Sequence, residues 1–180
     1  MGNLMRALLL ATVLLAPALV NAQAGGRAEI QIKAAFLYKF GGFVEWPAGA
    51  FAAADSPFTI GVLGGEPVAA ELEQITTGRT VQERPVSVRR LRRGEALAGL
   101  HVLFVGRDEV ARLPEILAAA KDQPLLVVTE SDNALTRGSM INFVAADDKV
   151  RFDVAPAAAG ALRISSRLLA VARRVVQGSS

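Results

Sequence analysis

The fold class is decided by two apolar runs, His101-Val102-Leu103-Phe104-Val105-Gly106 and Leu125-Leu126-Val127-Val128-Thr129. Both are continuously apolar instead of alternating, which is typical of strands buried on both faces of a sheet. The segment between them predicts a helix that Asp108 can cap. Its apolar residues recur at helical spacing, at Val110, Leu113, Ile116 and Leu117. The order strand, helix, strand predicts two parallel neighbours in an α/β sheet.

The same pattern extends toward the N-terminus. From Glu29, apolar residues at helical spacing predict a first helix that ends near Trp46-Pro47, because a residue before proline disfavours the α region. A loop over 48–56 leads to a predicted strand at 57–64 and a helix at 66–75. The alternating residues 86–91 predict a half-exposed strand.

The C-terminal third predicts a different arrangement. Residues 139–144 and 149–154 flank Asp147-Asp148 and predict a β-hairpin. Pro156 then opens a predicted long final helix, with Leu162, Ser166, Leu169 and Val176 among its inward residues. The expected fold is therefore α/β, with a mainly parallel sheet, helices on both faces, a C-terminal hairpin and a long last helix.

The first residues have the order of a secretory signal. Arg6 precedes an apolar run at 7–16, Pro17 breaks the run, and Val20-Asn21-Ala22 provides short residues for cleavage after Ala22. Cleavage after Ala24 and an uncleaved anchor are the alternatives, although the run is short for a span of about 20 residues. We expect a signal peptide at 1–22, a linker at 23–28, a single domain at 29–177 and a periplasmic location.

Composition excludes several kinds of function. The 180 residues are 52% hydrophobic and 21% charged, which is typical of a globular chain. The absence of cysteine excludes disulfides, thiolate nucleophiles and lipid attachment at a cysteine, and the single histidine, His101, disfavours a histidine-based metal site. The dense arginines at 84–93 lack interleaved aromatic residues, so we interpret them as a solvated strand edge or a contact for an acidic partner, not a nucleic-acid site.

Enzyme signatures are weak throughout the chain. Gly61-Val62-Leu63-Gly64-Gly65 lacks the full dinucleotide-binding order and any P-loop Lys-Ser/Thr, so it is interpreted as a strand-to-helix turn. No G-x-S-x-G motif occurs, and no partner for a catalytic triad is evident. We therefore predict a non-enzymatic protein with no catalytic residues and no cofactor.

A polar cluster follows the strand at 125–129. Glu130, Ser131 and Asp132 should lie at the carboxyl edge of the sheet, where open parallel sheets bind ligands. Ser139 comes soon after, and Arg163 and Arg167 are expected one turn apart on the final helix. If these side chains meet, they would form a pocket for a small zwitterion or anion, since arginine binds carboxylates in a bidentate manner. The alternative is an ordinary surface of loop carboxylates and helix arginines.

Several ordered blocks resemble the YfiR family of periplasmic proteins over residues 29–176. The blocks are residues 32–40 and 43–47, 57–64, 101–105, 138–143 with 150–154, and 162–169. The resemblance implies a regulator without catalysis, able to dimerise, that represses an inner-membrane diguanylate cyclase by binding its periplasmic sensor region. It also implies sequestration by an outer-membrane lipoprotein, effects on cyclic-di-GMP and biofilm formation, and binding of small molecules.

Three departures from the family pattern limit what can be carried over. The chain has no cysteines, so redox control does not transfer, and Ala155 and Lys39 stand where asparagine is common. As partner-interface residues we predict Phe36, Tyr38 and Trp46. Trp46 could instead anchor the first helix in the core, although tryptophan is enriched at binding hot spots. The two open hypotheses are a repressor of a membrane signalling protein and a small-ligand-binding protein that serves a sensor or transporter.

Overall fold

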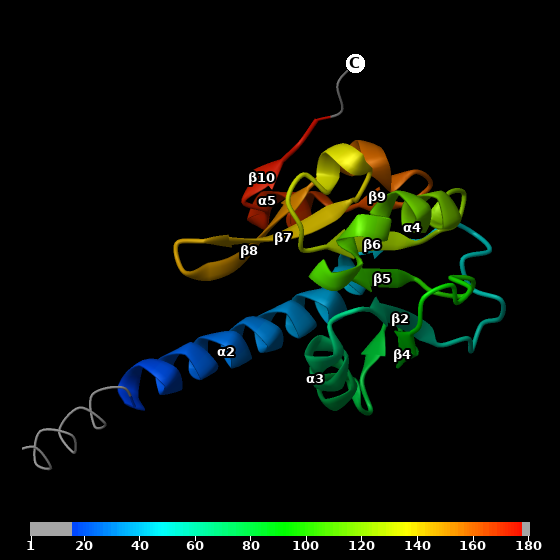
Figure 1. Ribbon diagram of the computed structural model, residues 1–180. Coiled ribbons are helices and arrows are strands. Elements are labelled where there is room, and N and C mark those ends of the chain that lie inside the picture. Colours follow the sequence, from blue (N-terminus) through cyan, green and yellow to red (C-terminus); the bar gives the residue numbers. More distant parts are fainter. Residues whose placement is uncertain (1–15, 178–180) are drawn as a thin grey trace, which may run out of the picture.

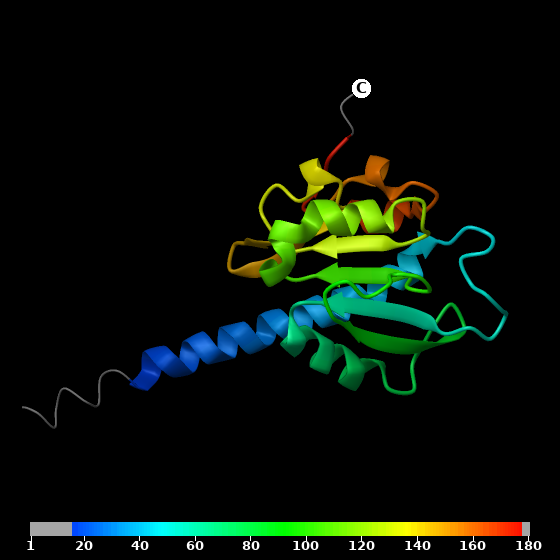
Figure 2. The ribbon, with the colours of Figure 1, turned by 45° about the vertical axis from the view of Figure 1, so that its right-hand side comes forward.

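The first helix is longer than the sequence predicts. In the computed structural model, which describes residues 16–177, α2 spans Ala16–Phe40 (Figure 1). α2 continues through residues 23–28, which the sequence predicts to be a linker, and their role as a linker stays a prediction. Residues 1–15 of the predicted signal peptide lie outside the described residues. The N-terminal part of α2 projects beyond the sheet in both views (Figures 1 and 2). None of the helices within residues 16–177 has the length and apolar character needed to cross a membrane.

The helix also ends earlier than predicted. The 3₁₀ turn η1, Gly41–Phe43, and the short strand β1, Val44–Glu45, follow Phe40 directly. Two consecutive glycines are poor helix formers, so the helix stops there and not at the residue before Pro47. Gly41 is also needed for close packing, since a Cβ there would lie 2.6 Å from Cζ of Phe58.

A curled eight-stranded sheet forms the centre of the fold, in the order β10-β8-β7-β6-β5-β2-β4-β3. The five central strands, β4, β2, β5, β6 and β7 in their order across the sheet, are parallel to one another. β7 and β8 form an antiparallel hairpin. A mainly parallel sheet is therefore confirmed. The strands span Phe58–Leu63 (β2), Thr80–Val81 (β3), Arg84–Leu91 (β4), Val102–Val105 (β5), Leu126–Thr129 (β6), Ile141–Ala146 (β7), Lys149–Val154 (β8) and Arg174–Val175 (β10).

Two apolar cores lie on opposite sides of the sheet. On β5, Val102 and Phe104 join the core under α2 and α3, Glu66–Thr76, whereas Leu103 and Val105 join the core under α4, Leu113–Ala120. This alternation follows from the period of two along a strand. Because both sets are buried, β5 is apolar throughout its length, as its run predicted.

The helix before β6 begins differently from the prediction. Asp108 does not cap it, because Asp108 lies inside a 3₁₀ segment, η2, Arg107–Arg112, whose N-cap is Gly106. The α-helix proper starts at Leu113, where Pro114 occupies the first turn. Proline favours this position since its missing N–H would have no intrahelical partner there.

The prediction of a long final helix is wrong. Beyond β8 the chain forms a 3₁₀ turn, η4, Pro156–Ala159, a strand β9, Arg163–Ile164, a short helix α5, Ser166–Val171, and then β10. Gly160, at φ +57, ends the turn, and β9 then pairs with β1. The predicted hairpin is present, with its turn at Asp147 and Asp148, whose φ values of 52° and 55° suit a type I′ turn.

Candidate functional site

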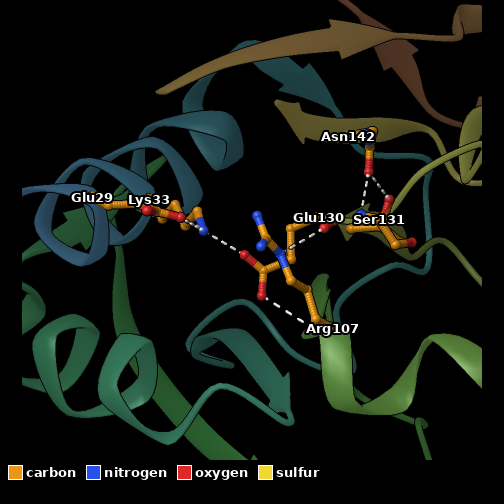
Figure 3. A network of polar contacts seen from close by, with 7 residues as sticks. Glu29, Lys33, Arg107, Glu130, Ser131 and Asn142 are labelled. Atoms are coloured by element: carbon orange, nitrogen blue, oxygen red, sulfur yellow. Dashed lines mark hydrogen bonds and ion pairs between the residues drawn. The ribbon is translucent and has the colours of Figure 1, made fainter. Parts of the chain in front are cut away.

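A network of charged and polar side chains lies where β5 and β6 end and β7 begins. Arg107 follows β5, Glu130 follows β6, and Asn142 is the second residue of β7. Lys33 reaches the same place from α2 (Figure 3). β5, β6 and β7 are neighbouring parallel strands, so residues that are distant in the sequence come together at this edge of the sheet.

Lys33 is the centre of the network. Its residue is 6% exposed, and its ammonium group donates to Glu29 one turn earlier on α2 and to Glu130 beyond β6 (Figure 3). A buried ammonium group is tolerated where it is paired and hydrogen-bonded. The two carboxylates meet this requirement, so the Lys33–Glu130 ion pair fastens α2 to the carboxyl edge of the sheet.

Arg107 holds Glu130 from the other side. The backbone N–H of Arg107 donates to Oε1 of Glu130 at 3.2 Å, and its Nε donates to the Glu130 carbonyl oxygen at 3.3 Å. The Glu130 side chain is 11% exposed. Both of its carboxylate oxygens are therefore engaged within the protein, and its first role is to position α2 and the loop after β5.

Asn142 organises the loop after β6. Its Oδ1 accepts hydrogen bonds from the Thr129 hydroxyl at 2.7 Å and from the Ser131 backbone N–H at 3.0 Å. Ser139 is fully buried, 2.9 Å from the Thr129 hydroxyl and 3.0 Å from the Ile141 carbonyl oxygen, to which it donates. Of the predicted site residues, Ser139 thus belongs to a buried hydroxyl network and does not face a cleft.

Two hollows flank the network. One, of about 400 Å³, lies between α2 and the β7–β8 hairpin and includes Ile32 and Val150 in its wall. The other, of about 670 Å³, has both polar and apolar residues in its wall; the polar ones are Glu130, Ser131, Asp132, Asn142 and the two arginines Arg107 and Arg173. We call this second hollow the edge cleft. The structure therefore brings Glu130, Ser131 and Asp132 to one cleft, and their ligand-binding role stays a prediction.

The predicted arginines are not at this cleft. Arg163 lies on β9 opposite Glu45, beyond the C-terminal end of α2, and Arg167 lies in α5, so they do not share a long helix. Arg107 and Arg173 line the edge cleft instead. Arg173 donates from Nε to Oδ1 of the buried Asp153 at 2.8 Å, and this hydrogen bond, with the negative charge, raises the pKa of Arg173.

Sequence reasoning missed Lys33, Arg107 and Asn142. A signal was present for Arg107, because it follows the buried strand β5 just as Glu130 follows β6. Lys33 was visible as a charged residue among the inward positions of the first helix. Asn142 had no comparable signal, since a polar residue in an alternating strand ordinarily faces solvent.

The predicted interface residues are partly buried. Phe36 packs in an aromatic cluster, with its ring centroid 5.2 Å from that of Phe152 and 5.8 Å from that of Phe40. Tyr38 donates its hydroxyl to the Thr80 carbonyl oxygen at 3.0 Å. Trp46 meets Phe58 edge to face at 5.4 Å. Each side chain contributes to packing, and a role in partner binding stays a prediction.

Two other sequence features have structural explanations. Gly64 and Gly65 have φ values of +67° and +90°, and a Cβ on the neighbouring Gly106 would lie 2.8 Å from the Gly64 carbonyl oxygen, so these turns are tightly packed against each other. In the arginine-rich stretch, Arg90 pairs with Glu66 and Glu73, and Arg93 pairs with Glu109. Across residues 16–177, no group of three or more histidine, cysteine, aspartate or glutamate side chains could hold a metal ion.

Comparison with known proteins identifies the family. No curated protein matches the chain. A profile described as YfiR/HmsC-like matches residues 30–173, from the buried half of α2 to the arginine that pairs with Asp153. This match covers most of the described chain, including the sheet, the hairpin and the edge cleft. The chain therefore belongs to the YfiR/HmsC-like family.

Proposed function

We propose that this protein is a non-catalytic periplasmic regulator that binds and represses the sensor region of an inner-membrane signalling protein, a diguanylate cyclase. The match to the YfiR/HmsC-like family over residues 30–173 carries this proposal. Through the cyclase it would control cyclic-di-GMP and biofilm formation. An outer-membrane lipoprotein that sequesters it and a homodimeric state are further parts of the same proposal.

The chemistry of the described residues supports a non-catalytic role. The carboxylate of Glu130 is engaged by Lys33 and Arg107, so it is not free to act as a base. His101, the one histidine of the chain, lies at the opposite end of β5, where its ring nitrogens are engaged with backbone groups. A base and a nucleophile need to lie within hydrogen-bond reach of each other, and these residues do not provide such a pair.

The exposed side of α2 is the surface we propose for the partner, next to the predicted residues Phe36, Tyr38 and Trp46. Ile32 is 39% exposed and lines the hollow between α2 and the hairpin. A large apolar side chain in a surface hollow is suited to anchor a partner, because interface energy is concentrated at a few such positions.

Co-purification tests the proposal. The mature protein should retain the periplasmic region of an inner-membrane cyclase, and deletion of its gene should raise cyclic-di-GMP. Ile32→Asp should weaken capture at least about tenfold, because one lost hot-spot contact contributes about 1.4 kcal/mol or more. Gln31→Asp, on the exposed neighbouring position, is the matched control and should bind normally. Unchanged cyclic-di-GMP on deletion, with no captured cyclase, would refute the repressor role.

The edge cleft favours a second candidate function, a small-ligand-binding protein that serves a sensor or transporter. Arg107 and Arg173 lie in its wall together with the carboxylates of Glu130 and Asp132, a combination suited to a zwitterion. A thermal-shift screen of amino acids and nucleotides tests it. A hit should be lost in Arg107→Gln and kept in Arg137→Gln, an exposed arginine of the nearby turn. A flat screen across both classes of compound counts against this function.

The division of the chain is also a proposal. Export with cleavage after Ala22 would leave a mature domain at residues 29–177 behind a short helical extension at 23–28. N-terminal sequencing of protein recovered from the periplasm decides between Ala22 and Ala24. Recovery in the membrane fraction with an intact N-terminus would instead support the uncleaved anchor.

A further inference from the structure

A loop is held to the amino edge of the sheet by the single histidine. Residues 46–57 connect β1 to β2, and His101 precedes β5. Its Nδ1 accepts a hydrogen bond from the Thr59 backbone N–H at 3.1 Å, so Nδ1 carries no proton. Its Nε2 then bears the hydrogen and donates to the Ala50 carbonyl oxygen at 3.1 Å. Neutral His101 thus links strand β2 to the middle of the loop.

Aromatic side chains of the loop and of β2 pack on the same imidazole. Phe51 stacks on it at 4.2 Å between centroids, with an angle of 19° between the planes, and Phe58 stacks on it at 5.1 Å. Trp46 meets its ring at 84° and 5.5 Å. The first half of the loop is therefore fastened through His101 by a hydrogen bond and by ring contacts, whereas Arg84 holds the second half by donating to the Ala53 and Ser56 carbonyl oxygens at 3.0 and 2.9 Å.

The surroundings oppose a positive charge on this ring. His101 is 3% exposed, and among residues 16–177 the charged group that acts on its ring is the Arg84 guanidinium of β4, which lies 3.8 Å from the Phe51 ring centroid. Glu45 and Asp55, at the two ends of the loop, are exposed, and neither carboxylate is among the groups that shift the pKa of His101. Burial lowers the pKa of His101, the hydrogen bond to Ala50 opposes this, and the charge of Arg84 lowers it further.

Protonation would also break a hydrogen bond directly. With a proton on Nδ1, two donors, this N–H and the Thr59 N–H, would face each other in a buried place. A buried donor without an acceptor is strongly unfavourable. The imidazolium can therefore be accommodated only if the ring leaves its site, and the Ala50 and Phe51 contacts leave with it.

We propose that His101 is an acid-sensitive latch whose protonation releases residues 46–51 of the loop and exposes Trp46 and Phe51. All parts of the latch belong to one chain, so it needs no partner to work. Its use, to change the surface offered to a partner as the surroundings acidify, rests on the proposed function. Because the loop contains a predicted interface residue, release would alter binding at that surface.

The chain offers a direct readout, since Trp46 is its one tryptophan and His101 its one histidine. Trp46 fluorescence and hydrogen exchange of residues 46–57 are followed from pH 7.5 to 4.5, with exchange corrected for the intrinsic effect of pH. Exchange in the loop should rise at least about tenfold, with a midpoint below the ordinary histidine value of about 6.5. The β5–β6 strands should stay protected over the same range.

Two variants assign the response. His101→Gln cannot be protonated and should show the same loop exchange at both ends of the range. Arg84→Gln removes the facing cation and should raise the midpoint. The midpoint is read at residues 46–51, because this variant also loses the hydrogen bonds from Arg84 to the Ala53 and Ser56 carbonyl oxygens. It carries the test if His101→Gln does not fold. An acid response that persists in His101→Gln, a midpoint unmoved or lowered in Arg84→Gln, or a loop unchanged down to pH 4.5 would each overturn the latch. A latch that works in a protein that captures no cyclase would leave the inference standing and refute the proposed function.

Discussion

Replacing Lys33 by methionine tests whether the buried ion pair holds α2 on the sheet. The substitution keeps the length of the side chain and removes the charge, which leaves the 11%-exposed Glu130 carboxylate without its ammonium partner. Breaking a buried pair from one side costs about 3–5 kcal/mol. The Arg107 N–H still donates to Glu130, and the half-exposed Glu29 can be solvated, so we expect the lower end, about 3 kcal/mol.

Urea unfolding followed by Trp46 fluorescence provides the measurement. Thermal unfolding provides a second readout: in a domain of this size, a loss of about 3 kcal/mol corresponds to a fall in Tm of roughly 6–12 °C. Lys39→Met, an exposed lysine on the same helix, is the matched control and should stay within about 0.5 kcal/mol. The double variant Lys33→Met, Glu130→Gln should recover most of the loss, since no unpaired charge remains. A loss below about 1 kcal/mol for Lys33→Met, or a double variant no better than the single one, would refute the reasoning.

Three further perturbations have expected outcomes. Gly106→Ala should cost about 1–3 kcal/mol in urea unfolding, because its Cβ would meet the Gly64 carbonyl oxygen at 2.8 Å; wild-type stability would show that these turns shift freely. Ser165→Ala should cost about 1 kcal/mol by the same assay, since the Ser165 hydroxyl caps α5, and Ser165→Asp should retain the stability; equal loss in both would argue against a cap. The lowered pKa of His101 means that the unfolded chain binds its proton more readily, so the stability from this residue is complete above about pH 6.5 and is lost as pH falls through the folded-state pKa. The difference in urea midpoint between wild type and His101→Gln should therefore narrow from pH 7.5 to 5, and a constant difference would contradict this.

The central sheet was predictable because local and global requirements coincide there. Residues 102–105 and 126–128 are apolar on both faces, and the structure buries both faces. The final helix failed for the opposite reason. Inward residues at helical spacing occur along 162–176, but residues 163–164 and 174–175 pair with β1 and β8 as strands. Strand pairing depends on such neighbours more than on local propensity.

The candidate site was predictable where one topological rule applied. Glu130 follows a parallel strand, and the rule that ligand sites lie at the carboxyl edge places it correctly at a cleft. The expectation for Arg163 and Arg167 failed because it depended on the long helix. Lys33 could not be matched to Glu130 from the sequence, since the pair spans 97 positions and depends on how α2 crosses the sheet.

The two proposed functions share residues and are therefore not independent. Arg107 and Glu130 line both the edge cleft and the hollow beside α2. An anion bound by the Arg107 guanidinium would draw it from the Glu130 carbonyl oxygen, and Glu130 is also the group that holds Lys33 of α2. A ligand in the cleft and a partner on α2 would then affect each other's affinity by the same factor, because coupling between two binding sites is reciprocal. A cleft ligand that leaves partner affinity unchanged would show that the Arg107–Glu130–Lys33 connection is a rigid support and does not link the two surfaces.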